Sequence, residues 1–218
     1  MIHRNTTLAA TVFCLLATGA ASADDNNWFV RPYVGLSQMS DLSADFEDID
    51  GLSGKADIDL DSGFTGGLGV GYRFNPQIAA EFGWEYRSNE SSVTLADTSE
   101  FDDGNYASNI FYLNGYYHFA ERGAWQPYVG GGLTWIEEID IDLERSGEEL
   151  SYSGDGDTGY QVFAGVNYRL SPDWQLQTEL RYGSITGIDL DGESGASGEI
   201  TDLDYETTTL HVGLVYAF

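Results

Sequence analysis

Basic residues, proline and cysteine are scarce in this sequence of 218 residues. Nine Lys and Arg residues face 36 Asp and Glu residues, for a formal net charge of −27. Such a chain cannot neutralise nucleic-acid phosphates in number, which excludes nucleic acid as a partner. The single cysteine, Cys14, allows no intramolecular disulfide. Four prolines beside 27 glycines fit neither collagen nor a Pro/Gly linker, and no run of about 18 apolar residues predicts a transmembrane helix.

The first 23 residues have the pattern of a secretory signal peptide. Arg4 supplies a positive charge, residues 8–16 form a short apolar run, and Ala21-Ser22-Ala23 is a typical cleavage site. An N-terminal membrane anchor is the less favoured alternative, because the apolar run is short for crossing a bilayer. We therefore predict a cleaved signal peptide over residues 1–23 and one exported domain over residues 24–218.

From Trp28 to the C-terminus, apolar residues recur at every second position, which is the period of a β-strand. Each segment with this pattern is about nine residues long, the length that a tilted strand needs to cross a lipid bilayer. The intervening positions are small or polar. The segments lie at residues 28–36, 64–72, 78–86, 111–119, 127–135, 160–168, 174–182 and 210–218.

A soluble sandwich and a membrane barrel share this alternation, because they differ only in whether the apolar face meets a core or lipid. The ends of the segments favour the barrel, since aromatic residues cluster there in two belts. One belt holds Trp28, Trp125, Tyr168, Trp174 and Phe218, and the other Phe64, Tyr86, Trp135, Tyr160 and Tyr182. Short turns also alternate with long links over residues 38–62, 88–108, 137–158 and 184–206, as periplasmic turns and extracellular loops do in outer-membrane barrels.

The sequence resembles the eight-stranded outer-membrane β-barrels, namely the OmpA-like transmembrane domain and the opacity-type porins. The resemblance implies an all-β fold: a single eight-stranded antiparallel transmembrane barrel with short periplasmic turns and four long acidic extracellular loops. It also implies location in the outer membrane of a Gram-negative cell, contact with lipid and lipopolysaccharide, and recognition of the C-terminal strand by the outer-membrane assembly machinery. The residues that carry it are Pro32-Tyr33-Val34-Gly35, Pro127-Tyr128-Val129-Gly130-Gly131-Gly132, Glu179-Leu180-Arg181-Tyr182 and the terminal stretch from Leu210 to Phe218.

Charged residues at the intervening positions are expected inside the barrel. Small barrels are filled by side chains, and an unpaired buried ion is costly, so opposite charges should pair there. Two functions remain open for such pairs: they brace the barrel, or they line a gated path for protons or ions. The residues concerned are Glu81, Glu85, Glu179, Arg31, Arg73, Arg87, Arg169 and Arg181.

Acidic residues concentrate in the four long links, which hold 29 of the 36. Acid and apolar residues alternate at 57–61, 138–144, 188–191 and 202–206. Counting along the strands places the acids of the first three stretches on the lumen side, as an acidic mouth, although one β-bulge would reverse any of them. Carboxylates of this kind suit Ca²⁺ or Mg²⁺. Divalent cations are therefore candidate partners of the loops, but no EF-hand spacing occurs and no metal-binding residue is assigned.

No group of residues predicts catalysis or a cofactor. Acyl transfer on lipid A needs a nucleophile with a base in reach, usually Ser with His. Beyond residue 23 the chain has two histidines, His118 and His211, and no serine stands two positions from His211. We therefore predict a non-enzymatic outer-membrane barrel with a structural or surface-interaction role and a largely filled lumen. The alternative is a narrow porin-like channel or transporter for small solutes or cations.

Overall fold

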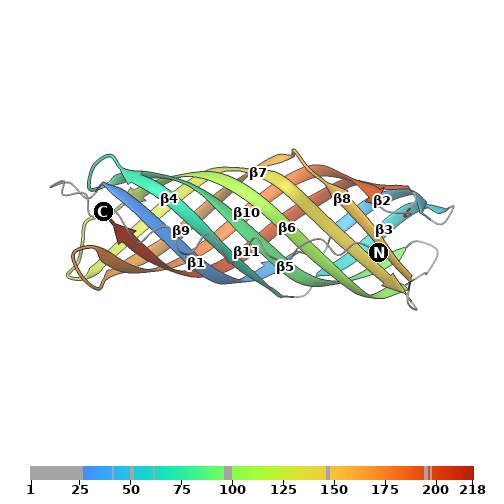
Figure 1. Ribbon diagram of the computed structural model, residues 1–218, viewed down its shortest axis with the longest axis horizontal. Helices are drawn as coiled ribbons and strands as arrows, with labels where there is room; N and C mark the ends of the chain where they lie inside the picture. The colour runs from blue at the N-terminus through green and yellow to red at the C-terminus, as the bar shows by residue number, and fades with distance from the viewer. Residues whose placement is uncertain are drawn as a thin grey trace, which may run out of the picture.

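The computed structural model describes residues 27–40, 42–49, 52–60, 62–95, 100–145, 148–193, 196 and 198–218, which form an all-β antiparallel fold (Figure 1). The predicted signal peptide over 1–23 lies outside the described residues. Each of the eight predicted segments coincides, to within one residue, with part of a strand, so these predictions are confirmed. The strands are β1 (Trp28–Met39), β2 (Leu42–Ile49), β3 (Leu52–Leu60), β4 (Gly63–Arg73), β5 (Ile78–Leu95), β6 (Glu100–His118), β7 (Trp125–Arg145), β8 (Glu148–Gly154), β9 (Thr158–Arg169), β10 (Trp174–Glu193) and β11 (Glu199–Ala217).

Eight of these strands close into a ring that we call the lower barrel. Its strands follow one another in the order β1, β4, β5, β6, β7, β9, β10 and β11, and β11 pairs with β1 to complete it. A closed ring leaves no free strand edge. Tight turns join consecutive strands at one end. In the first turn, the side-chain oxygen of Asn75 accepts hydrogen bonds from the backbone N–H groups of Gln77 and Ile78, a common role of Asn in turns.

The barrel continues past this ring as an outer half built with three shorter strands. The β2–β3 hairpin pairs with β11 on one side and β5 on the other, and so takes the positions that β1 and β4 hold in the lower barrel. β8 pairs with both β7 and β10 and takes the position of β9. Figure 1 shows these strands at the end of the cylinder opposite the C-terminus. The strands thus extend beyond the nine-residue segments, and β2 and β3 form a hairpin there.

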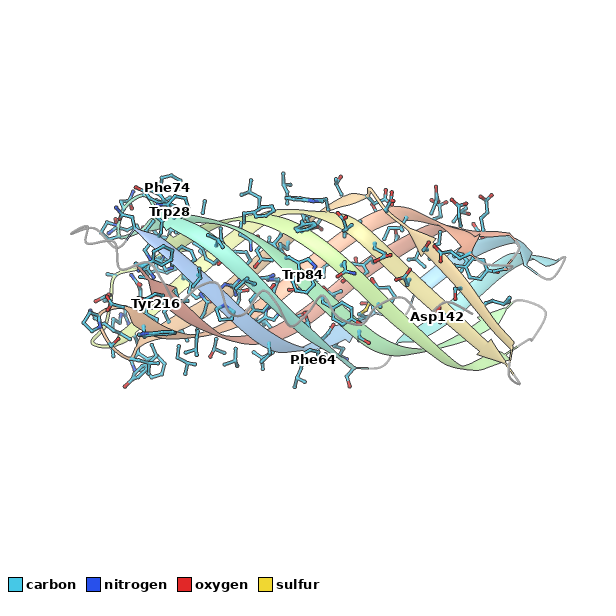
Figure 2. The ribbon with its side chains drawn as sticks, in the orientation of Figure 1. Trp28, Phe64, Phe74, Trp84, Asp142 and Tyr216 are labelled. Atoms are coloured by element: carbon cyan, nitrogen blue, oxygen red, sulfur yellow. The ribbon has the colours of Figure 1, made fainter. Side chains whose placement is uncertain are left out.

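The exterior of the lower barrel is apolar, and its interior holds polar side chains beside a small buried apolar cluster that includes Phe29, Phe163 and Val215. Large apolar side chains are exposed on the outside, such as Leu36 at 70% and Leu133 at 65%, and Figure 2 shows Phe64 projecting from the wall. Arg31 and Glu81 on the inside are each 1% exposed. The two faces therefore follow the predicted alternation. In the part of the chain that the structure describes, no helix is long and apolar enough to cross a membrane.

Glycines on β4 make room for large side chains in the narrow lumen. Gly67 and Gly71 pair with Tyr33 and Phe29 of β1, respectively. A methyl group at Gly67 would overlap the ring of Tyr33, and one at Gly71 would overlap the ring of Phe29. Glycine at such strand positions permits a close approach that other residues would block.

Candidate functional site

The first ion pair of the lumen joins Arg31 on β1 to Glu81 on β5. The Arg31 guanidinium donates hydrogen bonds to both carboxylate oxygens, at 2.6 and 2.9 Å. Tyr112 and Tyr116 on β6 donate to Glu81 Oε1 at 3.0 and 3.1 Å. Arg31 also donates to Gln177 on β10 at 3.0 Å. The pair therefore links four strands across the lumen.

A second cluster contains Glu85 and Arg87 on β5 with Glu179 and Arg181 on β10. Each strand contributes two residues that are two positions apart, so both side chains point into the lumen. Arg87 donates to Glu85 Oε1 at 2.6 Å, and Arg181 donates to Glu179 Oε1 at 2.6 Å. Arg181 also reaches Glu85 Oε2 at 3.3 Å and joins the two strands. All four residues are 5% exposed or less, so each buried charge is compensated by an opposite charge.

The prediction that all five arginines would share the lumen with the glutamates is wrong for Arg169. Arg169 is exposed and pairs with Glu121 in a short turn. Arg73 donates to Gln175 at 3.1 Å and lies over the ring of Phe29. Arg169 stands at the end of its strand, where a long side chain can reach past the barrel rim. Arg73 is half-buried at the same end and lines the small cavity beside Glu81 and His118, inside the barrel.

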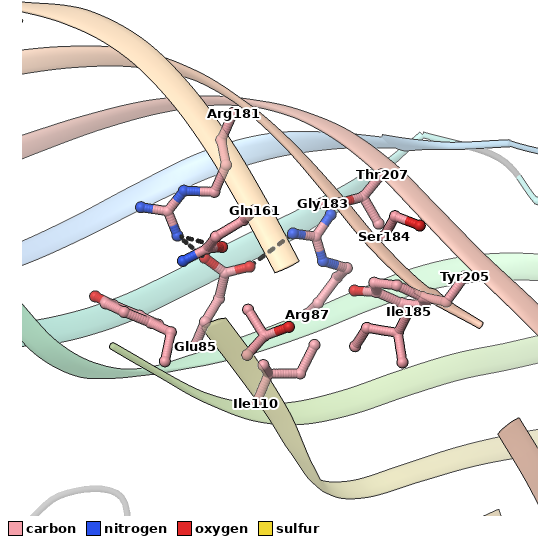
Figure 3. A pocket seen from close by; sticks show the side chains of 12 residues that line it. Glu85, Arg87, Ile110, Gln161, Arg181, Gly183, Ser184, Ile185, Tyr205 and Thr207 are labelled. Atoms are coloured by element: carbon pink, nitrogen blue, oxygen red, sulfur yellow. Dashed lines mark hydrogen bonds and ion pairs between the residues drawn. The ribbon is translucent and has the colours of Figure 1, made fainter. Parts of the chain in front are cut away.

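Two small cavities lie between these side chains. A cavity of about 20 Å³ lies between the charged cluster and the outer half, lined by Glu85, Arg87, Arg181, Thr134 and Tyr205 among others (Figure 3). A second cavity of about 10 Å³ lies beside Glu81 and His118. Each volume suits about one water molecule. These two cavities are much smaller than an open aqueous channel would require.

The outer half is filled by apolar side chains, which we call the apolar plug. Its members come from β1, β6, β7, β8, β10 and β11, and each is at most 6% exposed. Clusters of this size and burial are typical of a packed protein core rather than of a pore lining. The plug contains Met39, Tyr106, Ile110, Ile136, Ile139, Ile141, Tyr152, Ile185, Ile188, Leu190, Ile200, Leu203 and Tyr205.

The predicted acidic mouth is wrong in the stretches whose side chains the structure describes. Ile139 and Ile141 point inward, whereas Glu138 is exposed and Asp140 is half-buried on the outside. The cause is a β-bulge: Ile110 pairs with Ile136 and Asn109 with Glu138, which leaves one extra residue on β7 and reverses the alternation.

A similar irregularity acts on β10. Its register shifts between Ile185 and Ile188, and Gly187 there adopts a φ of 71°, a conformation that glycine accepts readily. Ile188 and Leu190 consequently point inward and Asp189 points outward. The stretch at 202–206 is out of phase with the other three, and its acids are exposed on the outside. The side chains of the stretch at 57–61 lie outside the described residues.

The outward-facing acids of β7 and β10 form a surface that we call the acidic wall. A hollow of about 510 Å³ on this wall is lined mainly by acids of β7 and β10 and by the end of β8: Glu137, Glu138, Ser153, Gly154, Asp155, Asp189, Asp191, Gly192 and Glu193. Asp142 lies in the same half of the barrel (Figure 2). Among the described residues, no group of three or more His, Cys, Asp or Glu side chains is placed to hold a metal ion.

The pKa of Asp140 reflects both its partial burial and the neighbouring carboxylates of the acidic wall. Partial burial and the nearby carboxylates of Glu138, Glu193 and Asp142 raise its pKa to about 6. The pKa in the folded state therefore exceeds the ordinary value of 3.8, so the ionised side chain destabilises the fold. This penalty is complete above about pH 6 and disappears as the pH falls from about 6 to about 4.

We expect Asp140→Asn to raise the free energy of unfolding by up to about 1 kcal/mol at pH 7.5, a modest gain because the site is partly solvated and screened. The gain should shrink towards zero at pH 4.5, where the wild-type side chain is also neutral. Urea unfolding of the protein in micelles, followed by tryptophan fluorescence at both pH values, measures this. A gain of equal size at both pH values would contradict the electrostatic explanation.

The two histidines lie on the inner face of the lower barrel. His118 is at the short-turn end, and its ring stacks on Tyr116 with centroids 5.9 Å apart. His211 lies deep in the lumen, with its ring nitrogens 3.4 and 3.6 Å from carboxylate oxygens of Glu85 and Glu179. The described contacts of His211 are thus with carboxylates and not with a serine nucleophile.

Sequence reasoning placed the charged residues in the lumen but did not identify the tyrosine hydroxyls as partners of the glutamates. Tyr33 donates to Glu85 at 2.9 Å and Tyr128 to Glu179 at 2.9 Å, and Tyr112 and Tyr116 serve Glu81. The signal was present, because all four stand at the same alternate positions as the charged residues. Tyrosine is ambiguous there, since its ring suits either face of a membrane barrel.

The same architecture occurs in proteins of known location. The family model described as "Outer membrane protein beta-barrel domain" matches residues 10–218. Outer membrane protein W of Vibrio cholerae is 22% identical over 175 residues, which cover 77% of this chain and 79% of that protein. The crystal structure of OprG from Pseudomonas aeruginosa covers 88% of this chain and 95% of its own, with a TM-score of 0.64 and 18% identity. The crystal structure of Neisserial surface protein A covers 88% of this chain and 97% of its own, with a TM-score of 0.53 and 17% identity.

These findings agree with the architecture derived above. Apolar side chains surround a closed antiparallel ring whose polar groups face inward, which is how a barrel satisfies its backbone within lipid. The protein is therefore located in the outer membrane. The chain belongs to the family of outer-membrane proteins that is defined by the β-barrel domain matched over residues 10–218.

Proposed function

We propose that the protein is a sealed barrel with a structural and surface-interaction role in the outer membrane. The observation that carries the proposal is the double filling of the lumen, by ion-paired side chains in the lower barrel and by the apolar plug in the outer half. Ion pairs held by several strands resist deformation of the wall, and a packed apolar core opposes the passage of hydrated ions. Together they suit a barrel that keeps its shape rather than a barrel that conducts ions.

The proposed role is non-catalytic. His211 contacts Glu85 and Glu179, and His118 stacks on an aromatic ring. Neither histidine is thereby positioned by its described contacts to activate a serine or threonine for acyl transfer. Lipid A hydrolysis or acyl transfer that is lost in His211→Ala would argue for an enzyme instead.

The acidic wall supports the surface part of the proposal. Its carboxylates repel one another, as the pKa of Asp140 indicates, and therefore attract counter-ions from solution. We propose that divalent cations gather there diffusely, without a defined site, and lie between these carboxylates and phosphates of lipopolysaccharide. At the opposite end, the backbone N–H of Phe218 bonds to Trp28 at 2.9 Å, and we propose the exposed C-terminal strand end as the element that the assembly machinery recognises.

Planar-bilayer recordings of the purified protein test the sealed-barrel proposal. We expect no steady conductance across a range of voltages, because charged side chains and the apolar plug fill the lumen in series. A porin reconstituted in the same way controls for insertion into the bilayer. Steady, ion-selective conductance would support the alternative, a narrow channel for small solutes or cations.

A deletion strain tests the positive part of the proposal. Loss of envelope integrity or of adhesion, restored by the wild-type protein on a plasmid, is the expected result. A deletion strain that matches its parent in both properties, with and without added divalent cations, would remove the structural and surface role.

A further inference from the structure

His211 occupies an unusual position between two carboxylates of different strands. It lies on β11 and is 1% exposed. Its Nε2 is 3.4 Å from Glu85 Oε2 on β5, and its Nδ1 is 3.6 Å from Glu179 Oε1 on β10. Neither ring nitrogen makes a hydrogen bond. Both polar atoms of a fully buried ring thus face acceptors without being satisfied, which is rare in folded proteins.

The groups around the ring come from each strand packed against it. Arg181 on β10 contacts the same two carboxylates, at 2.6 Å from Glu179 and 3.3 Å from Glu85. Tyr33 on β1 lies edge-on to the imidazole, with ring centroids 4.8 Å apart, and donates to Glu85. Arg87 on β5 donates to the other oxygen of Glu85 and to the hydroxyl of Thr209, and Tyr128 on β7 donates to Glu179. The two carboxylates therefore have hydrogen-bonded partners other than His211.

The chemistry of the ring decides what this arrangement can do. A neutral imidazole has one N–H donor and one lone pair, so with a carboxylate at each nitrogen the lone pair must face negative oxygen. An imidazolium has two donors and satisfies both carboxylates, with charge-assisted bonds after a shift of a few tenths of an ångström. Its additional positive charge then lies between two negative ones.

We propose that His211 is a proton-binding residue of the lumen, and that uptake of a proton ties β11 to β5 and β10 at once. β11 is the strand that closes the ring, because it pairs with both β1 and β10. Protonation therefore strengthens the barrel across its closing strand, and the protein acts as a proton-dependent lock. This property is additional to the proposed structural role and does not depend on it.

Nuclear magnetic resonance of the protein labelled with ¹⁵N-histidine, in lipid nanodiscs between pH 8.5 and 5.0, tests the proposal directly. Without the first 23 residues the chain has two histidines, and His118→Asn assigns their signals. At pH 5.0 we expect His211 to show protons on both ring nitrogens that exchange slowly with solvent. A neutral His211 throughout this range would overturn the proposal.

Glu179→Gln provides a matched variant, because it keeps the size of the side chain and removes its charge. We expect its His211 to bind the proton at least tenfold more weakly, which lowers the midpoint of the titration by at least one pH unit. An unchanged midpoint would contradict the shared role of the two carboxylates. Should the variant fail to fold, the wild-type titration still decides the question.

The melting temperature of His211→Gln, compared with that of the wild type at two pH values, is a second test. A histidine with a purely structural role would give a difference that does not depend on pH. The imidazolium makes two favourable contacts and the neutral ring at most one, so the stabilisation by His211 is largest at low pH and is lost as the pH rises. The melting temperature of the wild type should therefore exceed that of the variant by more at pH 5.0 than at pH 8.5. The acidic wall is identical in the wild type and the variant, so its effect on the melting temperature cancels in the difference. A difference that does not vary with pH would contradict the lock.

Discussion

Replacement of Glu81 by alanine is expected to lower the free energy of unfolding by about 3–5 kcal/mol, because it leaves Arg31 as a buried charge without its partner. Arg31 is 1% exposed and holds Glu81 with two hydrogen bonds. The hydroxyl groups of Tyr112 and Tyr116 would lose their acceptor in the same variant. Urea unfolding in lipid vesicles, followed by tryptophan fluorescence, measures the change.

Glu121→Ala is the matched control for this experiment. Glu121 forms an ion pair with Arg169, but both side chains are more than 40% exposed, and such surface pairs contribute only about 0–1 kcal/mol. The double variant Arg31→Met, Glu81→Met should lose less stability than Glu81→Ala, since it removes the uncompensated charge as well. Equal losses in Glu81→Ala and Glu121→Ala would show that the lumen pair is hydrated and does not brace the barrel.

The lower barrel could be predicted from the sequence because one physical rule governs it. Its wall separates lipid from a filled lumen, so apolar and polar residues must alternate, and the nine-residue length follows from the thickness of the membrane. Arg31, Glu81, Glu85, Arg87, Glu179 and Arg181 could thus be placed inside from their position alone. Their pairing followed from the cost of an unpaired buried charge.

The outer half could not be predicted in the same way. There the outer face meets water, so apolar side chains face the lumen and polar side chains face outward. This is the reverse of the arrangement in the lower barrel. The reversal depends on a bulge on β7 and on irregular residues of β10 near Gly187. A bulge is a change of backbone pairing between two strands, and the residues on either side do not encode it uniquely.

His211 shows a different limit of prediction. Its position in β11 indicated an inward-facing side chain, yet the two carboxylates that flank it are 32 and 126 residues away in the sequence. Only the register of β10 against β11, which pairs Glu179 with His211, and the closure of the ring bring them together. Spacing along one chain carries no record of such contacts across a lumen.

Replacement of Ile139 by aspartate is expected to destabilise the protein by at least about 4 kcal/mol, because it both removes packed volume and buries a carboxylate in the apolar plug. Ile139 is 0% exposed and lies among Ile141, Leu190 and other members of the plug. Ile139→Ala separates the two effects, since it leaves only the cavity and should cost about 2–5 kcal/mol. Urea unfolding of both variants in lipid vesicles gives the two values.

Asp140→Ala is the neighbouring control and should have the opposite effect, a gain of up to about 1 kcal/mol at neutral pH, since it removes a carboxylate whose pKa is raised by partial burial and by repulsion from its neighbours. The contrast between adjacent positions tests the bulge itself. If β7 continued its lower alternation without the bulge, Asp140 would face the lumen and Ile139 the solvent. Ile139→Asp would then be tolerated and Asp140→Ala would change the interior. The signs of the changes in the free energy of unfolding in Ile139→Asp and Asp140→Ala therefore decide which face of β7 carries the acids.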